Sequence, residues 1–343
     1  MPTIQFGYSL PIFAWPGHRL FRTPNWTKLD AKTTMKLGVY AEELGFDSLW
    51  VADHLMLGAD EAILEGWTTI SALAGATSRA RLGVIHQAHY FRPPSITAKM
   101  TATLDQISGG RFILFYDYGQ QLRENRAYGL PYPDEVDDRV QDTVDGIRII
   151  KALWEAAEPT STTSGPFSVY EATCTPLPVQ QPHPPIWFGE VHPGLLAACA
   201  EFGQGWNTTP VSIGELNRRL ELLKDACFAA GTSYDDIEKS VELQVLISSE
   251  NGSRKLLGDI LSKASSRNEV DPELNAYIDG SRNDPPEWLA NTTLIGSPGE
   301  VTKQLRAYVD VGVSHFILWF LDAPERTGME LFSREVAPAF RAS

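Results

Sequence analysis

An aspartate and a histidine, Asp53 and His54, directly follow a short apolar run at residues 48–51. The stretch around them, FDSLWVADHL at 46–55, reads as a buried strand that ends in a carboxylate and an imidazole. Such a pair at a strand end can bind a ligand or move a proton at the rim of a sheet or barrel. A loop histidine can equally be structural, so the elements around His54 must decide whether it carries chemistry.

Short apolar runs alternate with helical patterns along most of the chain. Eight runs are predicted as strands, at residues 4–8, 48–51, 81–85, 112–116, 186–188, 206–207, 241–247 and 315–320. The clearest helix is 137–154, where Val140, Val144 and Ile147 recur at the spacing of one helix face. A Ser-Pro start signal predicts a helix over 298–311, and Gly231 ends a helix over 216–230.

Eight strands that alternate with helices predict an α/β fold, a (β/α)8 barrel. We expect a single barrel domain over residues 1–343, with insertions after strands four and seven. The first, about 155–185, is rich in Ser, Thr and Pro and is expected to hold a short hairpin; the second, about 248–291, is polar and is expected to be mobile. The alternative, a doubly wound sheet, requires a glycine-rich phosphate turn after strand one, and Ser9-Leu10-Pro11 is not one.

Active sites of barrels lie where strands pass into the following loops, which selects candidate residues without an alignment. The candidates for proton transfer are Asp53 and His54 after strand two, His86 after strand three, and Asp117 after strand four. The candidates for contact with a cofactor are Trp50, His89, Tyr118, Gly119, Gln120, Gly189, Glu190 and Asn207.

Aromatic residues are also frequent near the predicted strand ends. A wide mouth lined by aromatic side chains suits a flat heteroaromatic ligand, which would be held by stacking and burial. The aromatic residues expected at this rim are Trp50, Tyr90, Phe91, Tyr116, Tyr118, Trp187 and Trp206.

Several other classes of function are disfavoured. No HxH, HExxH or CxxC motif is present, so we expect no metal site, and no GxSxG elbow indicates a serine hydrolase. The net charge of −14 disfavours nucleic acid and anionic membranes as partners. No apolar run reaches the roughly 20 residues that span a bilayer. The N-terminus has no basic region of a secretory signal, so a cytoplasmic protein is expected.

A set of motifs over nearly the full length resembles the luciferase-like superfamily of flavin-dependent oxidoreductases. The motifs are EELGFDSLWVADHL (42–55), EGWTTISALAGATSRARLG (65–83), ITAKMTATLDQISGGRFIL (96–114), RAYGLPYP (126–133), PPIWFGE (184–190), GQGWN (203–207) and IGSPGEVTKQLRAYVDVGVSHFILWF (295–320). The resemblance implies a (β/α)8 barrel and a reduced cofactor, either FMN in oxygen-using monooxygenases or the deazaflavin F420 in hydride transfer. It also implies that His54 faces the flavin ring.

Two positions depart from the family pattern. Where the deazaflavin branch often has a glycine followed by an acidic glutamate, this chain has Gly119-Gln120, and a glutamine cannot supply a titrating proton. Where a Gly-Gly pair is common, this chain has Gly189-Glu190, and a carboxylate is a poor neighbour for a cofactor phosphate. Asp117 or Glu190 could replace the lost acid.

The resemblance therefore implies an oxidoreductase acting on a small organic substrate, with F420-dependent hydride transfer favoured slightly. The alternative is an FMN-dependent monooxygenase of the two-component type, served by a separate flavin reductase. A second alternative is a relative that binds the cofactor but has lost catalysis. A homodimer is expected, as in this family.

Overall fold

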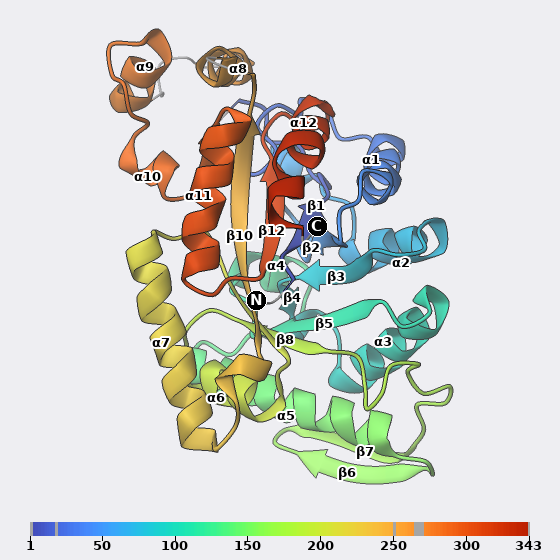
Figure 1. The fold of residues 1–343 in the computed structure, drawn as a ribbon. Coiled ribbons are helices and arrows are strands. Elements are labelled where there is room, and N and C mark those ends of the chain that lie inside the picture. The colour runs from blue at the N-terminus through green and yellow to red at the C-terminus, as the bar shows by residue number, and fades with distance from the viewer. Residues whose placement is uncertain (1–2, 18–19, 250–251, 264–270, 342–343) are drawn as a thin grey trace.

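The computed structural model describes residues 3–17, 20–249, 252–263 and 271–341. Its centre is a closed barrel of eight parallel strands (Figure 1). The strands are β1 (Gln5–Ser9), β2 (Ser48–Ala52), β3 (Arg81–Ile85), β5 (Phe112–Asp117), β8 (Ile186–Gly189), β9 (Gly205–Thr208), β10 (Glu238–Ile247) and β12 (His315–Phe320). Pairing of β9 with β10 closes the ring. The predicted (β/α)8 barrel is confirmed.

Eight of the helices in the described residues surround the barrel and follow its strands in order. They are α1 (Ala31–Glu43), α2 (Gly66–Ala76), α3 (Pro94–Ser108), α5 (Val136–Glu155), α6 (Pro193–Phe202), α7 (Ile213–Ala230), α11 (Pro298–Asp310) and α12 (Thr327–Glu335). The start of α11 is fixed by a capping box, in which Ser297 and Glu300 satisfy each other's backbone N–H groups. Gly231, at φ +70°, ends α7 in the left-handed conformation that glycine adopts at low cost.

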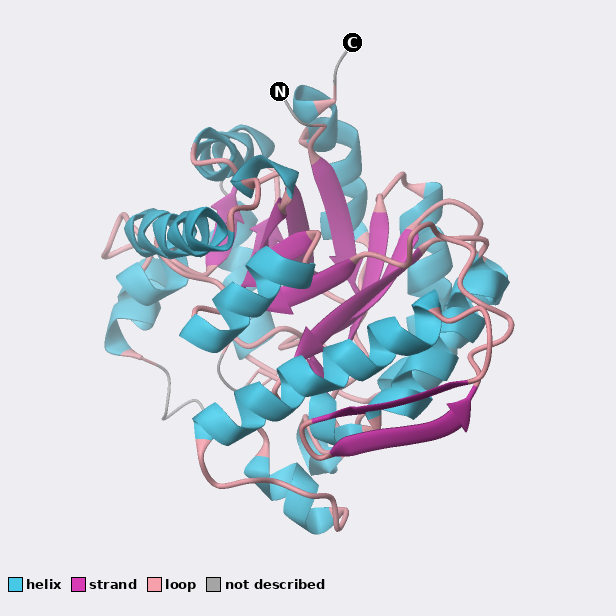
Figure 2. Ribbon diagram, turned by 90° about the horizontal axis from the view of Figure 1, so that it is seen from below, coloured by secondary structure: helices cyan, strands magenta, loops and turns pink. Residues whose placement is uncertain are grey.

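Both predicted insertions contain regular structure. The first holds the expected hairpin, β6 (Thr160–Ser164) and β7 (Phe167–Ala172), which lies along α5 (Figure 2). The second contains α8 (Gly252–Leu261), α9 (Pro272–Asp279) and α10 (Glu287–Ala290), three helices that were not expected from the sequence, and its mobility stays a prediction. Residues 250–251 and 264–270 of this segment lie outside the described residues.

Three further elements were not expected from the sequence. They are β4 (Gln87–Ala88), α4 (Leu122–Ala127) and β11 (Thr293–Gly296), and β11 pairs with the last four residues of β10. All three are short, which is why periodicity does not reveal them.

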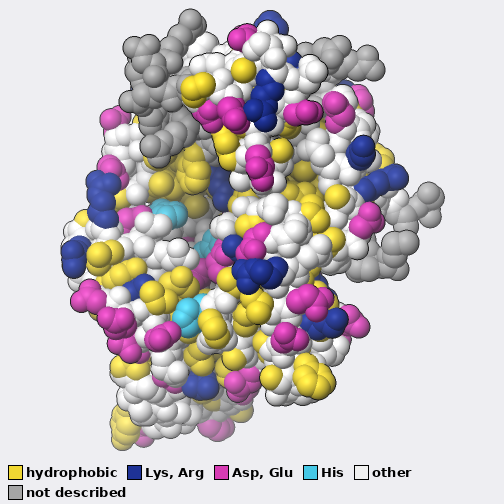
Figure 3. Space-filling view, turned by 90° about the vertical axis from the view of Figure 1, so that its left-hand side faces the viewer, with side chains coloured by type: hydrophobic (Ala, Val, Ile, Leu, Met, Phe, Trp, Pro, Cys, Tyr) yellow, Lys and Arg dark blue, Asp and Glu magenta, His cyan; other side chains and the backbone are white. Residues whose placement is uncertain are grey.

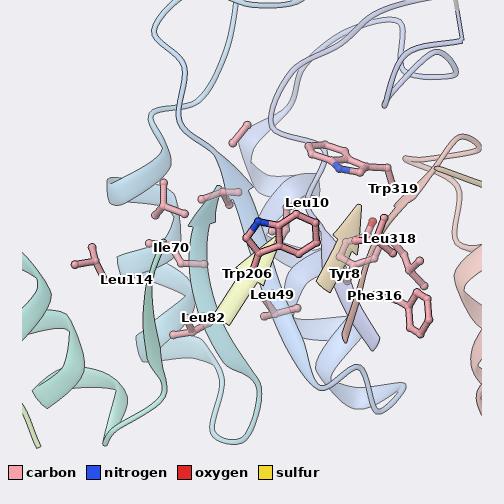
Figure 4. Packing of buried hydrophobic residues seen from close by; sticks show 14 of the residues in the cluster. Tyr8, Leu10, Leu49, Ile70, Leu82, Leu114, Trp206, Phe316, Leu318 and Trp319 are labelled. Carbon is pink, nitrogen blue, oxygen red and sulfur yellow. The ribbon is translucent and has the colours of Figure 1, made fainter. Parts of the chain in front are cut away.

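The barrel strands contribute to two parts of the core, because successive side chains on a strand point to opposite faces; a third, smaller cluster joins α8, α9 and α10 to the ends of β10 and β11. One face packs against the helices, and Leu49, Leu82, Leu114 and Leu318 belong to this outer layer (Figure 4). The other face fills the barrel, and its apolar cluster consists of Trp50, Ile85, Ile113, Phe115, Trp187 and Ile317.

Trp50 and Trp187 occupy the barrel interior with their ring centroids 5.3 Å apart. They fit because neighbouring strands carry glycine: a Cβ at Gly83 would lie 2.1 Å from the Trp50 ring, and one at Gly205 would lie 2.3 Å from the Trp187 ring. Both tryptophans are completely buried. The barrel is therefore packed through its middle, and a ligand can enter only at an end.

Replacing Gly83 by alanine is expected to lower the free energy of unfolding by about 1–3 kcal/mol, because the new methyl group overlaps the Trp50 ring. Gly75→Ala on α2 is the matched control, since nothing lies within 4 Å of its Cβ. Alanine there should stabilise the helix by up to about 1 kcal/mol. Denaturant melts of both variants measure this, and a Gly83→Ala protein as stable as the wild type would contradict the packing account.

Candidate active site

A cavity of about 250 Å³ lies at the carboxyl ends of the barrel strands. Its lining combines apolar side chains with acidic, basic and histidine side chains. Figure 3 shows a hollow in one face of the molecule where side chains of all these kinds gather. The residues that carry the argument below are Arg22, His54, His86, Asp117, Glu242 and Trp319.

His54 reaches this cavity from the loop after β2, and its orientation is set by Glu124 on α4. The Nδ1 atom of His54 donates to Oε1 of Glu124 over 2.8 Å, while Oε2 of Glu124 accepts from the backbone N–H of Leu55. Burial would raise the pKa of Glu124, but these hydrogen bonds lower it below its usual value. An ionised carboxylate only accepts, so the proton of the neutral imidazole lies on Nδ1.

The other ring nitrogen of His54 is therefore left with a lone pair. The described residues offer Nε2 no hydrogen-bond partner, and the side chain keeps 23% of its exposure. A histidine held by a carboxylate on one side and free on the other can accept a proton from a ligand.

His86 is bound very differently, although it lies in the same cavity. Its Nδ1 donates to Asp117 over 3.0 Å and its Nε2 donates to Glu242 over 2.8 Å. Burial would lower the pKa of His86, but hydrogen bonds and charge from the two carboxylates raise it to about 10. His86 is therefore a cation at neutral pH, with both N–H groups engaged and no lone pair to accept a proton.

Glu242, on β10, continues this row of charges. It accepts from Trp319 over 3.0 Å and pairs with Arg22 over 3.0 Å, in addition to His86. Burial would raise the pKa of Glu242, but the charge of Arg22 and the donors around it lower the pKa to about 2. Arg22, Glu242, His86 and Asp117 thus form a row of alternating charge in the cavity wall.

Two other acidic residues predicted for the site, Asp53 and Glu190, are held by ion pairs and hydrogen bonds. Asp53 accepts two hydrogen bonds from Arg92, over 2.9 and 3.0 Å, and one from the backbone of Ala88. Glu190, at φ +63°, accepts from the backbone and hydroxyl groups of Thr209 and from Arg219 over 2.6 Å. These carboxylates hold loops in place, and neither is free to act as an acid.

The structure brings seven of the twelve predicted residues to the cavity: Asp53, His54, His86, Asp117, Gly119, Gln120 and Glu190. Trp50, His89, Tyr118, Gly189 and Asn207 are not among its lining residues, and a contact between them and a cofactor stays a prediction. Trp50 fills the barrel below the cavity. His89 is buried and bonded to the Tyr116 hydroxyl, and burial lowers its pKa to about 3.

The expected aromatic rim is wrong for Trp50, Tyr116, Trp187 and Trp206, which are buried in the core. None of the seven aromatic residues lines the cavity, and its aromatic side chains come from Phe13, Phe21 and Trp319 instead. The sequence reasoning missed Arg22, Glu124, Glu242 and Trp319 as site residues. A signal existed for Glu242, since it is the only charged residue within the predicted strand 241–247.

The residues that the structure describes hold no group of three or more His, Cys, Asp or Glu side chains placed to bind a metal ion. None of the helices in the described ranges is long and apolar enough to cross a membrane.

Stability should depend on pH through His86. Folding raises the pKa of His86 from 6.5 to about 10, so its protonation stabilises the folded state. This contribution to the free energy of unfolding is complete below pH 6.5 and is lost as the pH rises through 10. We therefore expect the stability advantage of the wild type over His86→Gln to shrink between pH 6.5 and 10. Urea melts across this range measure it, and a constant difference would rule out a protonated His86 in the folded protein.

Comparison with known proteins assigns the chain to a family. A model described as luciferase-like monooxygenase matches residues 4–315. An F420-dependent glucose-6-phosphate dehydrogenase of Microbacterium testaceum is 27% identical over 318 residues, 90% of this chain and 93% of the relative.

Two solved structures share the fold at low identity. An F420-dependent secondary alcohol dehydrogenase, in complex with an F420-acetone adduct, aligns over all of both chains with a TM-score of 0.76 and 20% identity. A long-chain alkane monooxygenase aligns over 99% of this chain and 91% of its own, with a TM-score of 0.75 and 16% identity. The resemblance inferred from the motifs is confirmed by the family match, and the chain belongs to the luciferase-like monooxygenase family.

Proposed function

We propose that this protein is an F420-dependent oxidoreductase that exchanges a hydride with a small organic substrate. The observation that carries the proposal is the His54–Glu124 pair, which offers an unpartnered imidazole nitrogen at the cavity. A hydride can leave an alcohol carbon only if the hydroxyl proton also leaves, and His54 is placed to accept that proton. In the reverse direction the same residue returns a proton to the carbonyl oxygen.

Support for the deazaflavin comes from the curated relative, which is named for F420 and is covered over nearly its whole length. When bound, F420 accepts or supplies the hydride. The cavity fits the ring portion of such a cofactor, because it combines apolar walls from Phe13, Leu57 and Trp319 with the unpartnered Nε2 atom of His54. These walls would hold the ring, and His54 would lie beside it.

The cavity does not offer a binding site for the cofactor's phosphate. Arg22 is the only Lys or Arg among the lining residues that the structure describes, and it is paired with Glu242. At about 250 Å³, the cavity is also smaller than the roughly 300–1,000 Å³ typical of ligand sites. The phosphate and the tail would therefore lie outside the cavity, at its mouth.

The acid missing at Gln120 is replaced, in this proposal, by the His54–Glu124 pair and not by Asp117 or Glu190. Glu124 lies four residues after Gln120. The side chains of Asp117 and Glu190 are already bound, to His86 and to Arg219. His86, predicted as a proton-transfer residue, acts here as a fixed cation that holds the cavity wall.

Catalytic loss is disfavoured because the cavity is not filled by side chains. Tyr116 is buried in the core, Tyr118 is not among the lining residues, and Glu190 is bound to Arg219. The FMN-dependent monooxygenase with a separate reductase stays the alternative, since solved monooxygenases share the fold. The homodimer and the cytoplasmic location stay predictions.

The test is anaerobic single-turnover kinetics with oxidised F420 and a panel of primary and secondary alcohols. The proposal predicts loss of the absorbance of oxidised F420 without oxygen, at a rate that depends on the alcohol. Turnover that requires reduced FMN and oxygen, with no F420 reduction by any alcohol, would favour the monooxygenase.

His54→Ala should lower the rate of hydride transfer by about 10²–10⁴-fold, the usual contribution of a general base. Glu124→Gln should cause a smaller loss, because the amide oxygen still accepts from Nδ1 but carries no charge. Unfolding free energy should change by less than about 1 kcal/mol in His54→Ala, since the side chain is partly exposed.

The matched control is His192→Ala, which removes a partly exposed histidine at the start of α6, outside the cavity. Its rate should equal that of the wild type. Equal rates in His54→Ala and His192→Ala would remove His54 from the mechanism.

A further inference from the structure

Arg22 has a guanidinium group that is only partly satisfied. It lies in the described segment 20–26, between β1 and α1, and its side chain keeps 12% of its exposure at the cavity. Nη2 pairs with Glu242 over 3.0 Å, and the guanidinium lies 5.0 Å from the ring centroid of Trp319. Nη1 is buried, and no residue that the structure describes accepts a hydrogen bond from it.

The position of Arg22 is fixed by the surrounding chain. Its backbone N–H donates to Oε1 of Gln244 over 2.7 Å, and its backbone has φ +53°, a conformation that non-glycine residues seldom adopt. Burial lowers the pKa of the guanidinium, with the charge of Glu242 opposing this, but an arginine remains charged. A buried charged donor without an acceptor is costly, and a bound acceptor would remove that cost.

The charges around Arg22 indicate which kind of acceptor it can take. The positive charges of Arg22 and His86 are balanced by Glu242 and Asp117 within the row. An anionic ligand would add an unbalanced negative charge to this buried site, which is unfavourable. A neutral oxygen, as in a carbonyl or hydroxyl group, would satisfy Nη1 and leave the balance intact.

We propose that Arg22 is a specificity-determining residue that binds a neutral oxygen of the substrate, at a point separate from the reacting carbon at His54. The substrate class is an apolar compound with two oxygen functions: one is oxidised or reduced, and the other accepts from Nη1. Phe21, whose ring centroid lies 5.6 Å from the Arg22 guanidinium, would contact the apolar part of the substrate beside this oxygen. This inference rests on the proposed function.

The test uses the protein with oxidised F420 bound and ketone probes, which form a complex without turnover. Calorimetric titrations compare matched pairs with one and two oxygens: cyclohexanone with 1,4-cyclohexanedione, and 2-heptanone with 2,6-heptanedione. Cyclohexanecarboxylate and glucose 6-phosphate are the anionic probes. The variants are Arg22→Met, Arg22→Lys and, as matched control at an exposed arginine of α7, Arg218→Met.

In at least one pair, the wild type should bind the diketone about tenfold more tightly than the monoketone, the effect of one hydrogen bond from a charged donor. The ratio should fall to about one in Arg22→Met and remain at the wild-type value in Arg218→Met. Should Arg22→Met fail to fold in a thermal melt, Arg22→Lys carries the test, because lysine lacks the planar fork.

Three results would overturn the proposal. One is a ratio that is the same in the wild type and both Arg22 variants for every pair. Another is tighter binding of either anion than of the diketones, with the anion affinity lost in Arg22→Met. The third is a tenfold loss of F420 affinity in Arg22→Met with unchanged ketone ratios, which would assign Nη1 to a carbonyl oxygen of the cofactor ring.

A failure of the proposed function can be distinguished from a failure of this inference about Arg22. If the wild type does not bind F420, the same ketone titrations on the cofactor-free protein still report whether Arg22 reads a second oxygen.

Discussion

The buried carboxylate of Glu242 is the constraint on which the cavity depends. A charge removed from water must be paired and hydrogen-bonded, and Glu242 takes its donors from three separate parts of the chain. Arg22 comes from the loop over the barrel, His86 from the end of β3, and Trp319 from β12. Because breaking one contact leaves a buried charge unpaired, these segments are fixed relative to one another, and the wall of the cavity is rigid.

The two walls of the cavity differ in whether their side chains can exchange protons. In one wall, His86 and its carboxylates are mutually satisfied and cannot exchange protons without the loss of a buried ion pair. In the other, His54 is oriented by Glu124 and keeps a free nitrogen. The same principle explains why Glu190 is no replacement for an acid: Arg219 and Thr209 already hold it as a charged loop anchor.

Much of the fold could be predicted from the sequence, because strands buried on both faces appear as continuous apolar runs. The depth of a residue within the barrel could not be predicted. The sequence pattern places Trp50 at the rim, whereas the close approach of Gly83 to its ring shows that it fills the middle of the barrel. Glu242 lies 156 residues after His86, and Glu124 lies 70 residues after His54, so only the closed barrel brings each pair together. His54 and Asp117 were found because barrel strands deliver their following residues to one end.

The most direct measurement is an equilibrium titration of the wild-type protein with oxidised F420 and, separately, with FMN, followed by fluorescence. The account predicts that F420 binds at least about tenfold more tightly than FMN, a difference of about 1.4 kcal/mol in binding free energy. Tighter binding of FMN, or no binding of either cofactor, would contradict the assignment of this cavity to a deazaflavin ring.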